Sequence, residues 1–452
     1  MTAQITDIKS PELLVALTKY MRLVNFIGVA ELYLKDNFLL EQELKREHIK
    51  TRPLGHWGTV PGLNFIYANL NILIKRHNQE TMFIAGPGHG YPAILANLYI
   101  EGSLGEIYPE YQRSKQALGK LIKNFSWPGG FPSHSNPETP GAILEGGELG
   151  YSLGTAFGAA FDNPDLLVAC VIGDGEAETA TTATAWNSIK YLNPKTSGAV
   201  LPIVHINKFK ISGPTIFGTM SHEELTNLFE GYGYHPIIVD GDFLYEPMLN
   251  AMEEAYQKIK AIQKEARENG KIDKPKWPVI LLITKKGWTC PKESKGFMIE
   301  DSFRSHGVPF ENIHKDDEEF ALLKSWLESY KVNELLKDDG SPIDEIQELF
   351  PKKELLMGLN KNANGEMTKD LVLPDLQKYE FDLGKPGSKL TSNMAHLSKY
   401  LRDIIALNKD SFRVMSPDES VSNKLSPLFD VTERPYVWPS LPGAEKVGPD
   451  GR

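Results

Sequence analysis

Two polar residues with metal-binding potential each follow an apolar, β-branched segment. Asp174 comes directly after the segment 168–173, and Asn207 comes after the segment 201–206. The stretch between them, from about 177 to 189, has helical character, so this part of the chain is predicted to form strand, helix and strand. Parallel strands in such units end at one edge of a sheet, which is where open α/β sheets bind ligands. We therefore expect Asp174 and Asn207 to lie close together at that edge.

Carboxylate and amide oxygens are hard ligands that suit Mg²⁺ or Ca²⁺ bridging a diphosphate. Gly173 and Gly175 would let the backbone approach phosphate groups, and free N–H groups at a helix start near Glu176 would bind them. The alternative is a tight strand-to-helix turn capped by Asp174. The asparagine at the next strand end favours the metal site, because Gly-Asp-Gly followed by such an asparagine resembles the metal–diphosphate motif of thiamine diphosphate enzymes.

Four histidines lie in segments that are predicted to be loops. His56, His89 and His134 are surrounded by glycine and proline, and His306 ends the segment Phe-Arg-Ser-His. A single histidine in such a loop usually caps or hydrogen-bonds the backbone, but four of them indicate a shared polar pocket for proton transfer or phosphate contacts. Zinc is the less favoured alternative, because no His/Cys pair here has the close spacing of zinc ligands.

Composition excludes several classes of protein. A length of 452 residues predicts two or three domains, and 41% hydrophobic with 24% charged residues is typical of a globular protein. A net charge of −10 argues against a nucleic-acid partner. Cys170 and Cys290 are the two cysteines, so no disulfide framework is expected. No uninterrupted apolar run reaches about 18 residues and the N-terminus is no signal peptide, so we expect a cytoplasmic protein without a membrane span.

Alternating strands and helices predict an α/β fold: a doubly wound, mainly parallel sheet with helices on both faces. This first domain is expected over 1–334, followed by a linker over 335–387. Residues 388–452 are expected to begin a second, incomplete α/β domain, because about sixty residues form a small core. The expected strands are 81–85, 168–173, 201–206, 236–239 and 277–284. The expected helices are 11–37, 41–50, 63–75, 177–189, 247–269 and 388–407.

Five motifs together resemble the phosphoketolase family, in order and over nearly the whole chain. They are Gly55-His-Trp-Gly-Thr59, Gly86-Pro-Gly-His-Gly90, Glu145-Gly-Gly-Glu-Leu-Gly-Tyr151, Gly173-Asp-Gly-Glu-Ala-Glu178 and Phe303-Arg-Ser-His306. The third motif is very specific to that family. The resemblance is to the N-terminal half: the diphosphate-binding domain of a thiamine diphosphate fold, the linker and the start of the pyrimidine-binding domain.

The resemblance implies phosphorolytic cleavage of xylulose 5-phosphate to acetyl phosphate, glyceraldehyde 3-phosphate and water, with fructose 6-phosphate giving erythrose 4-phosphate. It implies thiamine diphosphate and Mg²⁺ (or Ca²⁺) as cofactors, and a sugar phosphate and inorganic phosphate as substrates. It also implies a homo-oligomer or a second chain that supplies the rest of the pyrimidine-binding domain, since the activating glutamate would lie beyond Arg452. The alternatives are a non-catalytic or truncated relative that associates with an intact enzyme, and a transketolase-type enzyme.

Site roles carried over from the resemblance fall into four groups. His56, His89, His134 and His306 would face the reacting carbons. Asp174, Asn207 and the backbone carbonyl of Phe209 would hold the metal. Gly146, Gly147, Glu148, Gly173, Gly175, Glu176 and Lys292 would bind the cofactor. Ser411 and Arg413 would bind the substrate phosphate.

The chain departs from the family pattern at several positions near these motifs. Ala142-Ile-Leu144 replaces Ser-Ile-His, and Ala180-Thr181 replaces Gly-Pro. Asn187 replaces a histidine, and Lys208 and Cys290 each replace a glycine.

Overall fold

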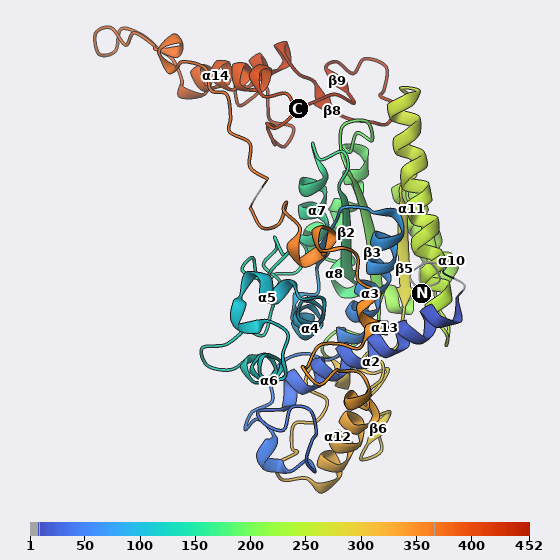
Figure 1. The fold of residues 1–452 in the computed structure, drawn as a ribbon. Helices are drawn as coiled ribbons and strands as arrows, with labels where there is room; N and C mark the ends of the chain where they lie inside the picture. The colour runs from blue at the N-terminus through green and yellow to red at the C-terminus, as the bar shows by residue number, and fades with distance from the viewer. Residues whose placement is uncertain (1–7, 9, 366) are drawn as a thin grey trace.

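A parallel sheet of five strands forms the centre of the molecule (Figure 1). The structure is a computed structural model that describes residues 8, 10–365 and 367–452. The strands lie in the order β1-β2-β3-β5-β4, and every neighbouring pair is parallel. The predicted α/β class with a mainly parallel sheet is therefore confirmed. The strands are β1 (Thr81–Ala85), β2 (Leu167–Gly173), β3 (Ala199–Ile206), β4 (His235–Val239) and β5 (Pro278–Ile283).

The two central strands are apolar on both faces because helices cover both sides of the sheet. Every residue of β3 is buried, and so is every residue of β2 except the last, Gly173. Gly173 pairs with His205 in the ladder between them, so Asp174 and Asn207 leave the sheet at the same edge.

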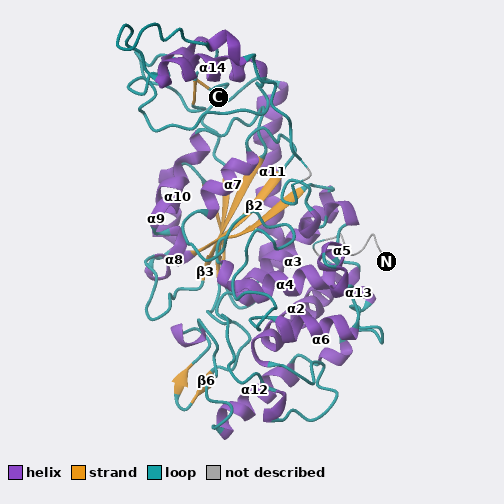
Figure 2. Ribbon diagram, turned by 90° about the vertical axis from the view of Figure 1, so that its left-hand side faces the viewer, coloured by secondary structure: helices purple, strands orange, loops and turns teal. Residues whose placement is uncertain are grey.

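Helices flank the sheet on both sides, with α9 and α10 on one side and α3 and α4 on the other (Figure 2). The bounds are α2 (Pro11–Tyr33), α3 (Val60–His77), α4 (Tyr91–Glu101), α5 (Ser103–Ile107), α6 (Lys115–Asn124), α7 (Ser152–Ala160), α8 (Asp174–Ala177), α9 (Ala180–Ala185), α10 (His222–Tyr232), α11 (Tyr245–Glu268), α12 (Asp317–Ser329), α13 (Asp344–Gln347) and α14 (Asn393–Leu407).

The predicted helices 11–37 and 388–407 are shorter in the structure, at 11–33 and 393–407, and two others are interrupted or largely absent. The segment 41–50 contains a short 3-10 turn at 46–48, because its backbone pairs with the end of α2: Lys35 N–H donates to His48 O and Lys50 N–H donates to Tyr33 O. The segment 177–189 is broken into the end of α8, helix α9 and a 3-10 turn at 186–190. The break lies at Ala180, whose φ of 50° is left-handed.

Helix α2 is a candidate membrane span by length and composition, although it contains no uninterrupted apolar run of about 18 residues. Its 23 residues are long and apolar enough, by length and composition, to cross a membrane. Lys19 and Arg22 interrupt its sequence, which is why no continuous apolar run is visible. Because 72% of its most apolar window is buried inside the molecule, α2 acts here as a core helix.

The C-terminal residues lie at one end of the molecule, and α12 with the hairpin β6 (Glu293–Ser294) and β7 (Phe297–Met298) lies at the other (Figures 1 and 2). The C-terminal part contains α14, a small apolar cluster and the paired strands β8 (Arg434–Pro435) and β9 (Val447–Gly448). Arg413 clamps it to the sheet domain, with Nε and Nη2 each 2.9 Å from the Asp162 carboxylate. Asp162 precedes β2, so this contact lies where the strands begin.

Candidate active site

The four loop histidines face one another in one pocket. The ring centroid of His56 lies 5.1 Å from that of His89 and 5.3 Å from those of His134 and His306. The rings of His89 and His306 stack at 5.2 Å. Each ring comes from a different loop, and the same pocket is lined by Asp174, as well as by Asn207, Phe209 and the glycines 146, 147, 173 and 175.

Backbone contacts hold these loops in place. Trp57 N–H donates to Gly307 O at 3.0 Å, and its indole Nε1 donates to Gly287 O at 3.1 Å. The loop after β1 packs against the loop before α7 at two glycines, since a Cβ on Gly88 would come 2.3 Å from Gly146 Cα. A side chain at either position would therefore push the two loops apart.

Three of the pocket histidines have a pKa below the usual value of imidazole. Burial lowers the pKa of His56 to about 4 and that of His306 to about 3, with the nearby Lys286 ammonium adding to both shifts. Burial, and then the neighbouring imidazoles, lower the pKa of His89 well below its usual value. Among the described residues, Nδ1 of His56 and Nδ1 of His306 have no hydrogen-bond partner, so both can bind a ligand.

Asp174 is buried and firmly oriented at the end of β2. Its Oδ1 accepts from Gly175 N–H at 2.9 Å, and its Oδ2 accepts from Lys208 N–H at 2.7 Å and Thr215 Oγ1 at 3.0 Å. Burial raises the pKa of this carboxyl to about 6, against the lowering effect of these hydrogen bonds and of Lys286. The carboxylate therefore faces the pocket in a fixed orientation.

The other two expected metal ligands, Asn207 and Phe209, both accept a hydrogen bond from the ammonium of Lys286. Lys286 Nζ lies 3.2 Å from Asn207 Oδ1 and 2.7 Å from the backbone carbonyl oxygen of Phe209. Lys286 is 2% exposed, and burial lowers its pKa to about 8 although Asp174 opposes the shift. An amide oxygen and a carbonyl oxygen thus already face a positive charge beside Asp174. These three oxygen ligands fit a divalent cation.

Glu176 connects the strand end to the glycine-rich loop. Its Oε1 accepts from Ser152 Oγ at 2.6 Å and from Gly150 N–H at 3.3 Å, and burial is the largest cause of its raised pKa. Its Oε2 is buried and has no partner among the described residues. The side chain lines the pocket and fixes the loop that carries Gly146 and Gly147.

Four of the predicted site residues are not brought into this pocket. Glu148 and Lys292 are exposed and do not line it. Ser411 and Arg413 belong to the C-terminal part, where Arg413 is paired with Asp162. Strand β2 separates Asp162 from Asp174, a distance of about 20 Å at roughly 3.3 Å per residue. Within one chain, Ser411 and Arg413 are therefore at the wrong edge of the sheet.

Sequence reasoning missed several residues of the pocket or its support, among them Lys286, Lys210 and Thr215. Lys286 follows β5, which lies next to β3, and it lines the pocket, whereas the predicted Lys292 does not. Lys210 also lines the pocket, and Thr215 holds Asp174 from behind. A lysine directly after a buried apolar strand was a usable signal for Lys286, but the strand order that makes it a neighbour of Asn207 is not visible in the sequence.

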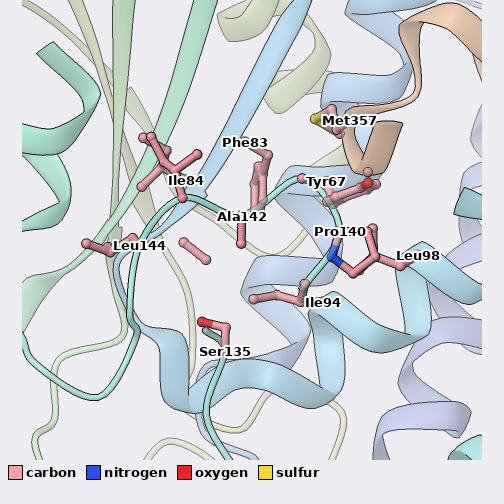
Figure 3. Close-up of a pocket in the computed structure, with 14 residues that line it drawn as sticks. Tyr67, Phe83, Ile84, Ile94, Leu98, Ser135, Pro140, Ala142, Leu144 and Met357 are labelled. Carbon is pink, nitrogen blue, oxygen red and sulfur yellow. The ribbon is translucent and has the colours of Figure 1, made fainter. Parts of the chain in front are cut away.

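Two departures from the family pattern line a different pocket from the histidines. Ala142 and Leu144 line a separate, apolar pocket behind the loop, together with Phe83, Ile84 and Ile94 (Figure 3). An alanine and a leucine suit this environment, in which a histidine would lose hydrogen bonds.

Two other departures occupy backbone conformations that favour glycine. Ala180 has a φ of 50° and Lys208 has a φ of 74°. Both residues therefore have a positive φ that costs a side-chain-bearing residue some strain.

Family comparisons agree with this architecture. The family model described as XFP N-terminal domain matches residues 8–368, and the model described as D-xylulose 5-phosphate/D-fructose 6-phosphate phosphoketolase matches residues 395–452. A probable phosphoketolase 2 from Nostoc sp. is 49% identical over 439 residues, which cover 96% of this chain and 55% of that protein. A probable phosphoketolase from Gloeobacter violaceus is 47% identical over 454 residues, which cover 99% of this chain and 57% of that protein. The chain thus spans little more than half the length of these relatives.

Solved structures show the same fold at low sequence identity. Transketolase from Campylobacter jejuni superposes with a TM-score of 0.56 at 17% identity, over 90% of this chain and 58% of that one. A transketolase mutant from Pichia stipitis, in complex with fructose 6-phosphate, gives 0.53 at 16% identity, over 91% and 57%. The fold is therefore that of the transketolases, and the chain belongs to the phosphoketolase family.

Proposed function

We propose that this chain supplies the cofactor-binding part of a phosphoketolase. The proposed reaction cleaves D-xylulose 5-phosphate with inorganic phosphate to acetyl phosphate, glyceraldehyde 3-phosphate and water, and fructose 6-phosphate is a second proposed substrate. In this proposal residues 1–334 bind the diphosphate, 335–387 link, and 388–452 begin the pyrimidine-binding domain. The proposal depends on one observation: four imidazoles lie in the same pocket as the Asp174 carboxylate, the Asn207 amide oxygen and the Phe209 carbonyl oxygen.

The pocket fits the cofactors that the family implies. Asp174, Asn207 Oδ1 and the Phe209 carbonyl would hold Mg²⁺ or Ca²⁺, because two of these oxygens already coordinate an ammonium. The backbone of Gly173 and Gly175 would lie along the diphosphate, with Glu176 fixing the neighbouring loop. When bound, thiamine diphosphate supplies the electron sink for carbon–carbon bond cleavage.

The side chains of this chain would bind and orient the substrate. His56, His89, His134 and His306 would donate or accept hydrogen bonds at the hydroxyl groups of the ketose and hold a proton at a ring nitrogen. A neutral imidazole N–H would donate a hydrogen bond to the hydroxyl that departs when the substrate loses water. Lys286 and Lys210 add positive charge for phosphate groups.

A second subunit is part of the proposal. Ser411 and Arg413 lie at the edge of the sheet where strands begin, so a role at a substrate phosphate requires the pocket of another subunit. The C-terminal part also exposes large apolar side chains, including Leu383 at 73%, Leu390 at 101% and Leu441 at 81%. Such surface is consistent with packing against a homo-oligomer partner or a chain that completes the pyrimidine-binding domain.

Acetyl phosphate formation tests the proposal. The chain is incubated with xylulose 5-phosphate, phosphate, thiamine diphosphate and Mg²⁺, alone and together with a polypeptide that carries the remaining pyrimidine-binding domain. We expect acetyl phosphate in the combined sample, and a His56→Gln chain as matched control should form far less. Product that requires an aldose acceptor instead of phosphate would identify a transketolase-type enzyme. Stable binding to a full-length relative without any product would identify a non-catalytic companion.

A further inference from the structure

His205 is a buried histidine of β3 that lies two residues before Asn207 and is 1% exposed. It does not line the histidine pocket, yet both of its ring nitrogens contact side chains. Nδ1 lies 3.1 Å from Thr59 Oγ1, and Nε2 lies 2.8 Å from Thr284 Oγ1. Thr59 ends the His56 loop, residues 54–59, and Thr284 directly follows β5. One imidazole therefore connects three segments, each of which contributes residues to the pocket.

The two threonine hydroxyls depend on this ring. Thr59 is 2% exposed and Thr284 is 6% exposed, and in the part of the chain that the structure describes neither hydroxyl has another hydrogen-bond partner. Thr59 occupies the N-cap position of α3, where a threonine hydroxyl commonly accepts a hydrogen bond from the helix backbone. It makes no such capping bond, so its hydroxyl is committed to His205 instead.

Close packing fixes the orientation of the ring. Helix α3 lies directly on it, since a Cβ on Gly62 would come 2.0 Å from His205 Cε1. A threonine hydroxyl can both donate and accept a hydrogen bond, so each threonine can match its ring nitrogen whether or not that nitrogen carries a proton. The ring can therefore bind both threonines at the same time and leave neither nitrogen unpaired.

We propose that His205 is a positioning residue that holds the His56 loop in a fixed place over the end of β3. Its contact with Thr59 fixes the start of α3 relative to the strand that leads to Asn207. The same contact sets the spacing between the four imidazoles and the proposed cation ligands. This consequence rests on the proposed function, because it takes Asn207 as a cation ligand. A displacement of about 1 Å at such a site is enough to slow a chemical step strongly.

Amide hydrogen exchange of the chain, measured by mass spectrometry, tests whether this contact holds the loop. The backbone N–H groups of Trp57 and Gly58 donate to Gly307 O and His306 O, so their exchange requires the His56 loop to open. Thr59→Val removes the hydroxyl but keeps the branched shape, and it should speed this exchange about fivefold, the effect of one lost hydrogen bond.

Thr284→Val is the matched control, because it removes the hydroxyl on the other side of the same ring. It should leave exchange at Trp57 within about twofold of the wild type, since the contact with Thr59 remains. The N–H groups of Ile49 and Lys50 donate to Arg46 O and Tyr33 O and report on general destabilisation, so their exchange should not change. Exchange at Trp57 that rises equally in both threonine variants, or in neither, would overturn the inference. A rise at Ile49 and Lys50 as large as that at Trp57 would overturn it as well.

Two variants of His205 keep the inference testable if Thr59→Val does not fold. His205→Asn places an amide near the former Nδ1, on the side of Thr59, whereas His205→Gln places it near the former Nε2, on the side of Thr284. An amide can donate and accept, so each variant should keep one of the two contacts. Exchange at Trp57 should rise in His205→Gln and stay near the wild-type rate in His205→Asn. The opposite order, or equal rates, would contradict the proposed contact.

Acetyl phosphate formation separates this inference from the proposed function. In the combined sample, His205→Gln should lower kcat about tenfold while KM for xylulose 5-phosphate changes less than about threefold, and His205→Asn should restore most of the rate. An unchanged kcat in His205→Gln would overturn the role of His205 at the site. If the wild type itself forms no acetyl phosphate, the proposed function fails, and the exchange measurements still decide whether His205 holds the loop.

Discussion

Ala180 offers a direct test of the left-handed backbone between α8 and α9. Its φ of 50° is left-handed, and it lies at the break between α8 and α9. An L-residue with a side chain pays about 1–2 kcal/mol in this conformation. Replacement by glycine removes that strain, but it also makes the unfolded chain more flexible, which takes back roughly 0.4–1 kcal/mol. Ala180→Gly should therefore stabilise the chain by about 0.5–1 kcal/mol.

Urea unfolding followed by tryptophan fluorescence measures this effect. Trp186 is fully buried just after α9 and donates from Nε1 to Ala177 O at 3.1 Å, so it reports on this region. With a slope of about 3 kcal/mol per M, the midpoint should rise by about 0.2–0.3 M without a change of slope. The matched control is Ala183→Gly inside α9, which should lower stability by about 0.5–1 kcal/mol. If Ala180→Gly destabilises the chain as Ala183→Gly does, the left-handed conformation of Ala180 is refuted.

Three further substitutions probe the pocket, a buried carboxyl and the C-terminal clamp. When the chain is combined with a polypeptide that carries the remaining pyrimidine-binding domain, His56→Gln should lower the rate of acetyl phosphate formation by about 100-fold or more. The far-ultraviolet circular dichroism spectrum should be unchanged. A near-normal rate would contradict a role of His56 at the reacting carbons. Burial raises the pKa of Glu101 from 4.5 to about 7. Between these pH values the folded chain therefore binds more protons than the unfolded chain, and the free energy of unfolding falls as the pH rises. Glu101→Gln should flatten the thermal stability profile between pH 5 and 8, and an unaltered slope would speak against this origin. Asp162→Asn leaves Arg413 and Arg452 without their carboxylate, so it should cost on the order of 2 kcal/mol and speed proteolysis of the exposed segment 371–391. An unchanged cleavage rate would show that the clamp does not hold the C-terminal part.

The position of Asp174 beside Asn207 was predictable because it depends on local rules. Apolar, β-branched segments form buried strands, and a strand-helix-strand unit puts both strand ends at one edge. The same rules predicted the five strands to within two residues at most ends. Local pattern failed at 177–189, where the left-handed Ala180 breaks a stretch that otherwise has helical composition.

The remaining site residues depend on contacts that the sequence does not encode locally. Lys286 reaches Asn207 because β5 lies next to β3, and that order skips β4. Lys292 was expected instead, but it lies in an exposed turn. Arg413 could not be placed because sequence order does not say which edge of the sheet the C-terminal part contacts. It lies beside Asp162, at the edge opposite the pocket.

Anomalous diffraction from the chain crystallised with Mn²⁺ and thiamine diphosphate is the most direct test of the central claim, that one pocket combines a cation site with four histidines. The predicted result is a Mn²⁺ peak bounded by Asp174, Asn207 Oδ1 and the Phe209 carbonyl, with the diphosphate on Gly173 and Gly175 and the four imidazoles around the thiazolium end. A Mn²⁺ peak away from these oxygens, with the cofactor outside the histidine pocket, would contradict the claim.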